Sequence, residues 1–325
     1  MRAARITELG QSPVLEEIDE PLPAEGQAVI APTAVPLNPI DIATSNGTFY
    51  GGSPSTPYTP GSEGVGVVVQ AESLPAGTRV YVSGDGLGRQ RDGTLAERAV
   101  VAEEILTPVP EEASDELAGA CGTAGMSGWL PVVWRAQTTP EDRVLVLGAT
   151  GTVGLAAVQA ARIIGTQVIV AAGRRPEGLA VAERVGATAV VRLDGEDLPA
   201  KLREAAGGDG FTVIIDPLWG EPIVAALEAA APRARVVQLG QSAGAIAEIP
   251  SGLVRGKQLD ILGYANPQLP LELRREAYLE LARRACTGEV EFPTETYAFE
   301  HVAEAWERQA AGPGTKLIVR VGDRS

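Results

Sequence analysis

The spacing of apolar and polar residues along the chain changes character near residue 114. Before that point, short apolar runs at 27–31, 64–70 and 79–82 are separated by clusters of proline and glycine. Strands this short, with turns this dense, are typical of an all-β unit with long connections. The pattern therefore predicts a mostly β N-terminal domain.

Beyond residue 114 the pattern alternates between strands and helices. Continuous Val, Ile and Leu runs without polar alternation predict strands that are covered on both faces, and hence a parallel sheet between helix layers. Pro176 at the first position of one helix and Gly186 after its end follow the usual asymmetry of helix termini. The expected strands are 144–147, 167–171, 188–191, 211–215, 234–239 and 259–264, and the expected helices are 152–164, 176–186, 196–206 and 220–230.

The stretch after about residue 267 is too small to stand alone. It contains an amphipathic helix at 271–284, a second near 301–309 and a final strand at 316–321. We expect this tail to complete the N-terminal domain, which makes the α/β unit an insert. The expected domains are thus 1–120 with 268–325, and 121–267.

Composition and charge limit the classes of partner. Hydrophobic residues make up 45% of the chain and charged residues 21%, as in globular proteins. The net charge of −15 argues against nucleic acid as a partner, because phosphate binding needs clustered Lys and Arg. No apolar run approaches ~18 residues, so no membrane partner is expected and a cytoplasmic location is predicted. Two cysteines, Cys121 and Cys286, are too few for a disulfide framework or a structural zinc site.

A glycine-rich turn lies between a predicted strand and a predicted helix. Gly148 permits a tight turn, Gly151 leaves backbone N–H groups open to a pyrophosphate, and Gly154 lets the helix pack close to the strand. The alternative is an ordinary strand–helix turn, but the flanking strands favour dinucleotide binding. The residues expected to bind the cofactor here are Gly148, Thr150, Gly151, Thr152, Val153 and Gly154.

The end of the next strand indicates which dinucleotide is bound. An NAD site places an Asp or Glu there for the ribose 2′-hydroxyl, whereas this chain has Gly173, Arg174 and Arg175. A guanidinium grips a 2′-phosphate through paired hydrogen bonds. Two solvated arginines are the alternative. We favour NADPH as the cofactor, with Arg174 as the main clamp.

Several motifs occur in an order and spacing that resemble the medium-chain dehydrogenase/reductase superfamily. They are Leu37-Asn-Pro-Ile-Asp41, Pro60-Gly-Ser-Glu-Gly64-Val-Gly66, Gly77-Thr-Arg-Val80, Gly93-Thr-Leu-Ala-Glu97, the glycine turn and Gly314-Thr-Lys-Leu-Ile-Val319. The resemblance covers nearly the whole chain. It implies a GroES-like, mostly β catalytic domain, an inserted Rossmann domain with a doubly wound parallel sheet, and an active cleft between them.

The resemblance also allows the zinc ligands of the superfamily to be checked. Members with zinc carry a Cys near the Asn38 position, a His at the Ser62 position and a third ligand near Thr123. Cys121 is two residues out of that register, and a single thiol cannot hold Zn²⁺. The lone histidine, His301, reads as an ordinary helix residue. We therefore expect no metal.

Within the superfamily the pattern is most similar to the zinc-free quinone oxidoreductases and enoyl reductases. The resemblance implies that Asn38 approaches the nicotinamide ribose and that Asp41 orders the loop. Relatives carry a Tyr proposed as a proton donor. Tyr50 lies one residue beyond the usual spacing, so a catalytic role and a role as a loop aromatic are about equally supported. Water near Asn38 and Ser62 is another candidate donor.

The same resemblance extends the expected cofactor site to other segments. Close backbone approach to the nicotinamide is expected at Leu239, Gly240, Gln241 and Tyr264, with Ser127 at the register of a family Thr. Lys316 either reaches the cofactor or lies on the surface, and we slightly prefer the surface position. The exposed sixth strand is expected to pair with its copy in a homodimer.

These residues predict delivery of a hydride to an activated double bond, as in a quinone, enone or enoyl thioester. Without a metal, no Lewis acid polarises an unactivated carbonyl. Two alternatives stay open: reduction of an iminium ion or reactive carbonyl in a biosynthetic pathway, and a non-catalytic NADPH-binding sensor. The stretch 49–58 is where substrate choice would be made.

Overall fold

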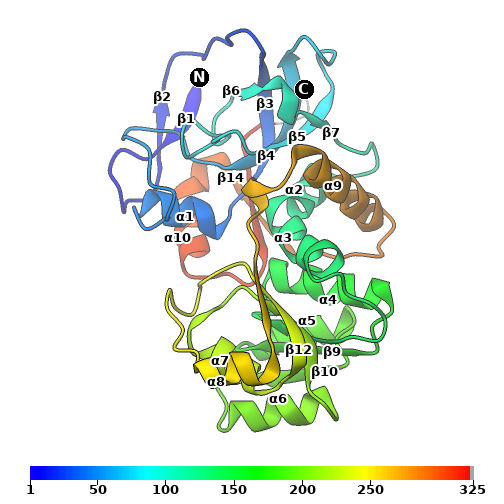
Figure 1. Cartoon of the computed structure of the whole chain (residues 1–325). Coiled ribbons are helices and arrows are strands. Elements are labelled where there is room, and N and C mark those ends of the chain that lie inside the picture. Colours follow the sequence, from blue (N-terminus) through cyan, green and yellow to red (C-terminus); the bar gives the residue numbers. More distant parts are fainter. Residues whose placement is uncertain (323–325) are drawn as a thin grey trace. The chain divides into compact units, whose positions relative to one another are not determined.

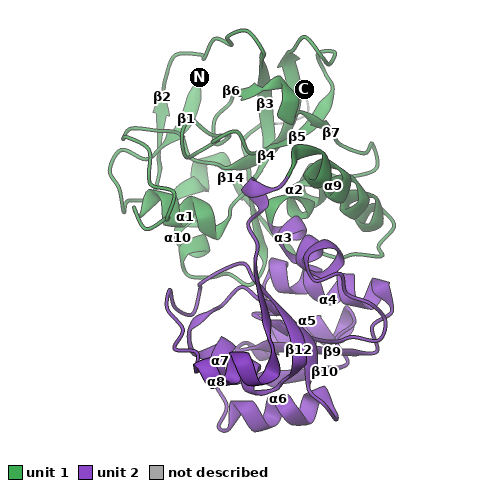
Figure 2. Ribbon diagram, viewed as in Figure 1, with its two compact units in different colours: residues 1–123, 270–325 green, residues 124–269 purple. Residues whose placement is uncertain are grey.

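The computed structural model of the protein describes residues 1–322 (Figure 1). Two compact units are coloured separately in Figure 2: residues 1–123 with 270–325 form unit 1, and residues 124–269 form unit 2. The boundaries lie within three residues of those expected from the sequence. Residues 323–325 of the expected C-terminal segment lie outside the described residues.

Unit 2 is built on a six-stranded parallel sheet. Its strand order is β10-β9-β8-β11-β12-β13, which is 3-2-1-4-5-6 when counted along the unit. This is the order of a doubly wound Rossmann fold, so the predicted fold class is confirmed. The strands are β8 (Arg143–Leu147), β9 (Val168–Gly173), β10 (Ala189–Arg192), β11 (Phe211–Asp216), β12 (Ala230–Gln238) and β13 (Asp260–Gly263).

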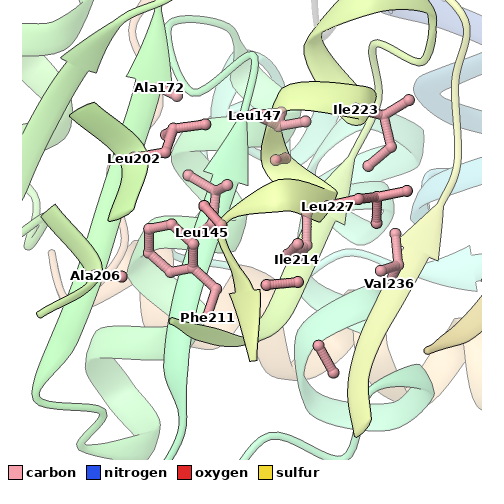
Figure 3. Close-up of a cluster of buried hydrophobic side chains, with 14 of the residues drawn as sticks. Leu145, Leu147, Ala172, Leu202, Ala206, Phe211, Ile214, Ile223, Leu227 and Val236 are labelled. Atoms are coloured by element: carbon pink, nitrogen blue, oxygen red, sulfur yellow. The ribbon is translucent and has the colours of Figure 1, made fainter. Parts of the chain in front are cut away.

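Helices cover both faces of this sheet, as the apolar strands require. α4 and α5 lie on one face, and α6, α7 and α8 lie on the other (Figure 1). Figure 3 shows Leu202 and Leu227 of that second layer gathered around Leu145, Phe211 and Ile214 of the sheet, and all five are fully buried. The helices are α3 (Met126–Leu130), α4 (Thr152–Ile164), α5 (Pro176–Arg184), α6 (Leu198–Ala206), α7 (Gly220–Glu228) and α8 (Ser251–Lys257).

Unit 1 is mostly β. A seven-stranded sheet has the path β14-β15-β3-β4-β5-β7, with β6 added beside β3, and β1 pairs with β2 separately. The strands are β1 (Arg2–Arg5), β2 (Val14–Glu17), β3 (Gln27–Pro36), β4 (Glu63–Gln70), β5 (Arg79–Ser83), β6 (Ala99–Ala102), β7 (Thr107–Pro108), β14 (Thr294–Ala298) and β15 (Lys316–Arg320).

The C-terminal tail completes this sheet. β15 runs antiparallel to β3, with Ile318 opposite Pro36, and parallel to β14. Residues nearly 300 positions apart in sequence thus share one sheet, and unit 2 is an insert in unit 1. The helices of unit 1 are α1 (Pro39–Ser45), α2 (Asp115–Ala120), α9 (Leu271–Cys286) and α10 (Val302–Ala310).

Candidate functional site

The glycine turn of unit 2 has the geometry of an anion-binding helix start. Gly148 follows β8 with φ of 62°, a conformation that favours glycine. A Cβ added at Gly154 would lie 2.4 Å from the Cα of Ala149, so α4 can approach the turn only without a side chain. Among the described residues, no atom lies within 4 Å of such a Cβ at Gly151, and no side chain caps α4. The first N–H groups of α4 therefore face open space.

Two arginines follow β9, next to this turn. Thr150 packs against Gly173, where an added Cβ would lie 2.4 Å from its methyl carbon. Arg175 donates from Nη2 to the carbonyl oxygen of Thr150 at 3.3 Å, which fixes it against the turn. Arg174 makes no hydrogen bond or ion pair with any residue in 1–322. The pKa of the exposed Asp194 is lowered first by its hydrogen bonds from Arg192 and also by the charge of Arg174.

The predicted segment after β12 lies beside the same turn. The Leu239 N–H donates to the carbonyl oxygen of Asp216 at 3.0 Å, and a Cβ on Gly240 would lie 2.5 Å from the oxygen of Pro217. Pro217 is in turn 3.2 Å from the Cβ position of Gly148. Leu239 and Gly240 thus meet the glycine turn at the carboxyl edge of the sheet, whereas the side chain of Gln241 is exposed.

Asp216, at the end of β11, is a residue that the sequence analysis missed. It is fully buried, and its Oδ1 accepts hydrogen bonds from the N–H groups of Leu218 and Trp219, both at 2.9 Å. Its Oδ2 is buried without a partner in the described residues. Desolvation raises the pKa of Asp216 to about 6, despite those two hydrogen bonds.

Ser127 and Tyr264 lie near one another within unit 2. A Cβ on Gly128, next to Ser127, would lie 2.1 Å from the oxygen of Val153, so α3 packs directly on the first turn of α4. Tyr264 is buried, and its hydroxyl donates to the Asn266 side chain and, at 3.4 Å, to the carbonyl oxygen of Met126. These residues therefore adjoin the start of α4.

In unit 1, four buried polar side chains form one connected network. Glu63 is completely buried, and its Oε1 accepts from Asn38 Nδ2 at 2.7 Å. Lys316 Nζ donates to Asn38 Oδ1 at 2.7 Å and lies 3.5 Å from the same Glu63 oxygen. Tyr81 OH and the Thr123 N–H both donate to Glu63 Oε2 at 2.6 Å. The carboxylate thus has donors on both oxygens, as a buried charge requires.

The preferred surface position of Lys316 was wrong. Its side chain is 3% exposed, and its ammonium also donates to the carbonyl oxygen of Leu37 at 3.0 Å. Desolvation lowers the pKa of Lys316, and the charges of Glu63 and Asp41 oppose that effect. The ammonium therefore lies inside unit 1 with three oxygen acceptors. Nothing in the local sequence of β15 distinguishes such a lysine from an exposed one.

Asp41 links the two motifs that carry the predicted catalytic residues. Its Oδ2 accepts from the Asn38 N–H at 2.8 Å, and its Oδ1 accepts from the Ser62 N–H at 2.9 Å. Desolvation raises the pKa of Asp41, and its hydrogen bonds partly offset this. Asn38, Asp41 and Ser62 are all buried and adjacent. Because Asn38 Nδ2 bonds Glu63 and Pro36 while Oδ1 bonds Lys316, its amide is held within unit 1.

Tyr50 is not part of this network. It lies in the loop after α1, is 81% exposed and packs on Phe49 with ring centroids 4.4 Å apart. Arg89 lies over the other aromatic ring, 5.8 Å from the centroid of Phe49. The loop thus presents two aromatic rings, one of which lies under the guanidinium of Arg89.

Glu63 and Tyr81 are functional candidates that sequence reasoning missed. Glu63 was recognised only as part of a motif, although a lone carboxylate at the head of an apolar strand is a signal for a buried partner. Gly122 explains its fit, since a Cβ there would lie 2.3 Å from Glu63 Oε2. Such a contact between residues 59 positions apart cannot be read from spacing.

Potential metal donors are dispersed. Within residues 1–322, no group of three or more His, Cys, Asp or Glu is arranged to hold a metal ion. Cys121 is buried, and burial raises the pKa of its thiol. His301 directly precedes α10 rather than lying within it, is largely exposed and has its Nδ1 3.5 Å from a carboxylate oxygen of Glu304. Separately, none of the described helices combines the length and apolar character needed to cross a bilayer.

Comparison with known proteins establishes the family. An alcohol dehydrogenase GroES-like domain matches residues 24–111, and a zinc-binding dehydrogenase domain matches residues 152–283. The human protein named quinone oxidoreductase is 31% identical over 270 residues, which cover 81% of this chain and 79% of the human protein. The chain belongs to the medium-chain dehydrogenase/reductase superfamily, in its quinone oxidoreductase-like branch.

Other members of this branch match over longer spans. A quinone oxidoreductase-like protein 2 homolog from Nematostella vectensis is 28% identical over 331 residues, covering 98% of this chain and 88% of that protein. The quinone oxidoreductase from Thermus thermophilus, whose structure was also solved in complex with NADPH, is 29% identical with a TM-score of 0.82, covering 99% of this chain and 100% of its own.

Membership in the superfamily makes this protein an oxidoreductase of a group that uses nicotinamide cofactors. It also confirms the GroES-like character of unit 1. The zinc-binding dehydrogenase match begins at residue 152 and therefore does not include Asn38, Ser62 or Thr123, the positions at which the sequence resemblance predicts the zinc ligands of zinc-containing members.

Proposed function

We propose that this quinone oxidoreductase-like protein is an NADPH-dependent reductase that adds hydride to an activated double bond without a metal. One observation carries the cofactor choice. Arg174, directly after β9, has no hydrogen-bond or ion-pair partner within 1–322 and follows Gly173, which packs on Thr150 of the glycine turn. A free guanidinium next to an anion-binding helix start suits a nucleotide with an additional phosphate. The Thermus relative solved with NADPH supports the same choice.

The residues of unit 2 fit this cofactor. The open space at Gly151 leaves room for a pyrophosphate on the N–H groups of α4. Arg174 and Arg175 would hold the 2′-phosphate, and no carboxylate occupies 173–175 to repel it. Leu239 and Gly240 present backbone at the same edge of the sheet.

The side chains of unit 1 support a metal-free reaction. Asn38, Ser62 and Thr123 stand where zinc ligands would be, and Asn38 Oδ1 already accepts from Lys316. When bound, NADPH supplies the hydride, and reduction of the double bond takes up one proton as well. Ser62, Tyr50 or a water held near them would deliver that proton. The substrate must therefore be activated by conjugation, as in a quinone, enone or enoyl thioester.

The cofactor assignment is tested by calorimetry on the Arg174→Asp and Arg175→Asp variants. Arg174→Asp should weaken NADPH binding by ~1–3 kcal/mol, the scale of a charge-assisted hydrogen bond, and leave NADH binding little changed. Arg203→Asp, an exposed change on α6, is the matched control. Unchanged NADPH preference in both variants would reject the clamp. Absence of binding of either coenzyme would reject the function.

Turnover separates the substrate classes. NADPH oxidation should be measured with a quinone, a 2-enone and a cyclic imine. Reduction of the first two supports the proposal, and reduction of the imine alone supports the iminium alternative. Tight NADPH binding without turnover of any electrophile favours the sensor.

We also propose a cytoplasmic homodimer formed through β13. This strand ends the sheet, and Ile261 on it is 40% exposed. Pairing β13 with its copy would cover an exposed strand edge. Light scattering should give about twice the 33.7 kDa of one chain, and a monomer mass would contradict the dimer.

A further inference from the structure

Arg89 is half-buried, and its side chain makes no ion pair or hydrogen bond with any residue in 1–322. Its Nε is buried without a hydrogen-bond partner among the described residues, and its guanidinium carbon lies 5.8 Å from the centroid of the Phe49 ring. Removing a charged donor from water without an acceptor costs free energy, and a bound oxyanion recovers it. This arginine therefore differs from those of unit 1 that bond to protein oxygens.

The nearby carboxylates are already engaged. Asp85 pairs with Arg91 at 2.8 Å, and Asp92 pairs with Arg5 at 3.0 Å. Asp41, the buried carboxylate of the site, is bonded to the N–H groups of Asn38 and Ser62. These three carboxylates thus have partners other than Arg89.

The position of Arg89 connects it to the candidate site of unit 1. The preceding Gly88 packs so closely on Gly61 that an added Cβ would lie 2.9 Å from the backbone nitrogen and carbon of Gly61. Gly61 directly precedes Ser62. On its other side, Arg89 lies over Phe49, whose N–H bonds to α1 at 3.1 Å. Arg89 thus stands between the Ser62 segment and the loop that carries Tyr50.

We infer that Arg89 binds an oxyanion, a carboxylate or a phosphate, on the electrophilic substrate. This inference rests on the proposed reductase function and narrows its substrate class to acidic enones and enoyl compounds. A guanidinium offers two parallel N–H donors to such a group, and its stacking on Phe49 orients the fork before the substrate arrives. The aromatic loop then covers the apolar part of the same molecule.

Two matched substrate pairs test the inference. (E)-4-Oxopent-2-enoate is compared with its methyl ester, and crotonyl-CoA with crotonyl-N-acetylcysteamine, in NADPH-oxidation assays. Wild-type protein should prefer the anionic member of at least one pair. Arg89→Gln should lower kcat/KM for that member about 10–100-fold, mainly through KM, and change the neutral member less than about twofold. Arg89→Lys should restore part of the loss, since it keeps the charge without the fork.

Controls separate this role from a structural one. Arg98→Gln removes a guanidinium of the same unit that donates to the backbone oxygen of Glu97. In both substrate pairs, this variant should leave the ratio of kcat/KM between the anionic and the neutral member unchanged. If Arg89 only stabilises the Phe49 loop, Arg89→Gln will slow both members of a pair equally, which overturns the inference. The pair that responds identifies the anion as carboxylate or nucleotide phosphate.

Equilibrium binding measurements test anion binding by Arg89 independently of turnover. Calorimetry with the four compounds should show the same anionic preference in wild-type protein and its loss in Arg89→Gln. Equal affinities within each pair overturn the inference. Reduction of neutral esters without an Arg89 effect would leave the reductase function standing, whereas failure to bind NADPH would remove that function by itself.

Discussion

Replacing Asp216 by Asn should make the protein more stable, and increasingly so as the pH rises. Asp216 carries one oxygen with two N–H donors and one buried oxygen that has no donor among residues 1–322. Desolvation raises its pKa from 3.8 to about 6. Folding therefore favours the protonated carboxyl, and the contribution to stability present below pH ~4 is lost as the pH rises through about 6.

The size of the effect follows from that shift. A change from 3.8 to about 6 corresponds to roughly 3 kcal/mol between the protonated and ionised limits. Roughly 1.4 kcal/mol of it falls between pH 5 and pH 8. This range keeps the protein above its isoelectric point of about 4.7. Asn cannot ionise and keeps one oxygen for the two N–H donors.

Urea unfolding followed by tryptophan fluorescence measures the difference between Asp216→Asn and wild-type protein. Other groups titrate alike in both proteins, so the difference isolates Asp216. It should grow by roughly 1–1.5 kcal/mol in favour of the variant between pH 5 and pH 8. A difference that does not change with pH would refute the argument.

Asp142 provides the matched control in the same unit. Burial alone would raise its pKa, but hydrogen bonds from Thr212, the Thr139 N–H and Arg235 outweigh burial and lower it. A lowered pKa gives stability that is present above the unfolded value and lost as the pH falls. Asp142→Asn should therefore be less stable than wild-type protein at pH 8, with the deficit shrinking toward low pH.

Other substitutions follow from local geometry. Gly154→Ala should lower the free energy of unfolding in urea by ~1–3 kcal/mol, because its Cβ would lie 2.4 Å from backbone. Gly151→Ala should leave that free energy unchanged and weaken NADPH binding measured by calorimetry. Equal changes in stability and in NADPH affinity for the two variants would contradict the turn geometry. Tyr278→Phe removes a buried hydroxyl that has no partner in the described residues and should be neutral or stabilising by up to ~1 kcal/mol, while Tyr81→Phe should destabilise. Lys316→Met should lower the free energy of unfolding by ~3–5 kcal/mol, because it leaves the buried carboxylate of Glu63 without its cation. A urea unfolding midpoint equal to that of wild-type protein would disprove this role.

The fold could largely be predicted because its signals are local. The helix expected at 152–164 has those bounds in the structure, since Gly151 precedes it and Gly165, with φ of 93°, ends it. The strands of unit 2 are apolar runs, which are buried from water only in a sheet that helices cover on both faces. In contrast, β1 and β2 pair with each other outside the main sheet and contain Arg and Glu. Their polar composition gave no strand signal.

The candidate site likewise contains residues that the sequence could predict and residues that it could not. The position of Arg174 directly after a strand could be predicted, because the apolar pattern of the sequence shows where that strand ends. The roles of Glu63 and Lys316 could not, because they depend on contacts across 253 residues. Asn38 illustrates the limit: the resemblance implies that it approaches the nicotinamide ribose, which stays a prediction, and no sequence signal shows that its amide bonds Lys316 and Glu63.

The strand that carries Lys316 sets an order of assembly on the ribosome. Residues 124–269 are continuous, so the nucleotide-binding unit emerges whole and can fold while the unit begun before it is still unfinished. Until β15 is translated, Glu63 has no ammonium partner and β3 has an unpaired edge. Nascent chains arrested just before β15, after residue 314, should therefore resist protease in the second unit and be cleaved readily in the first.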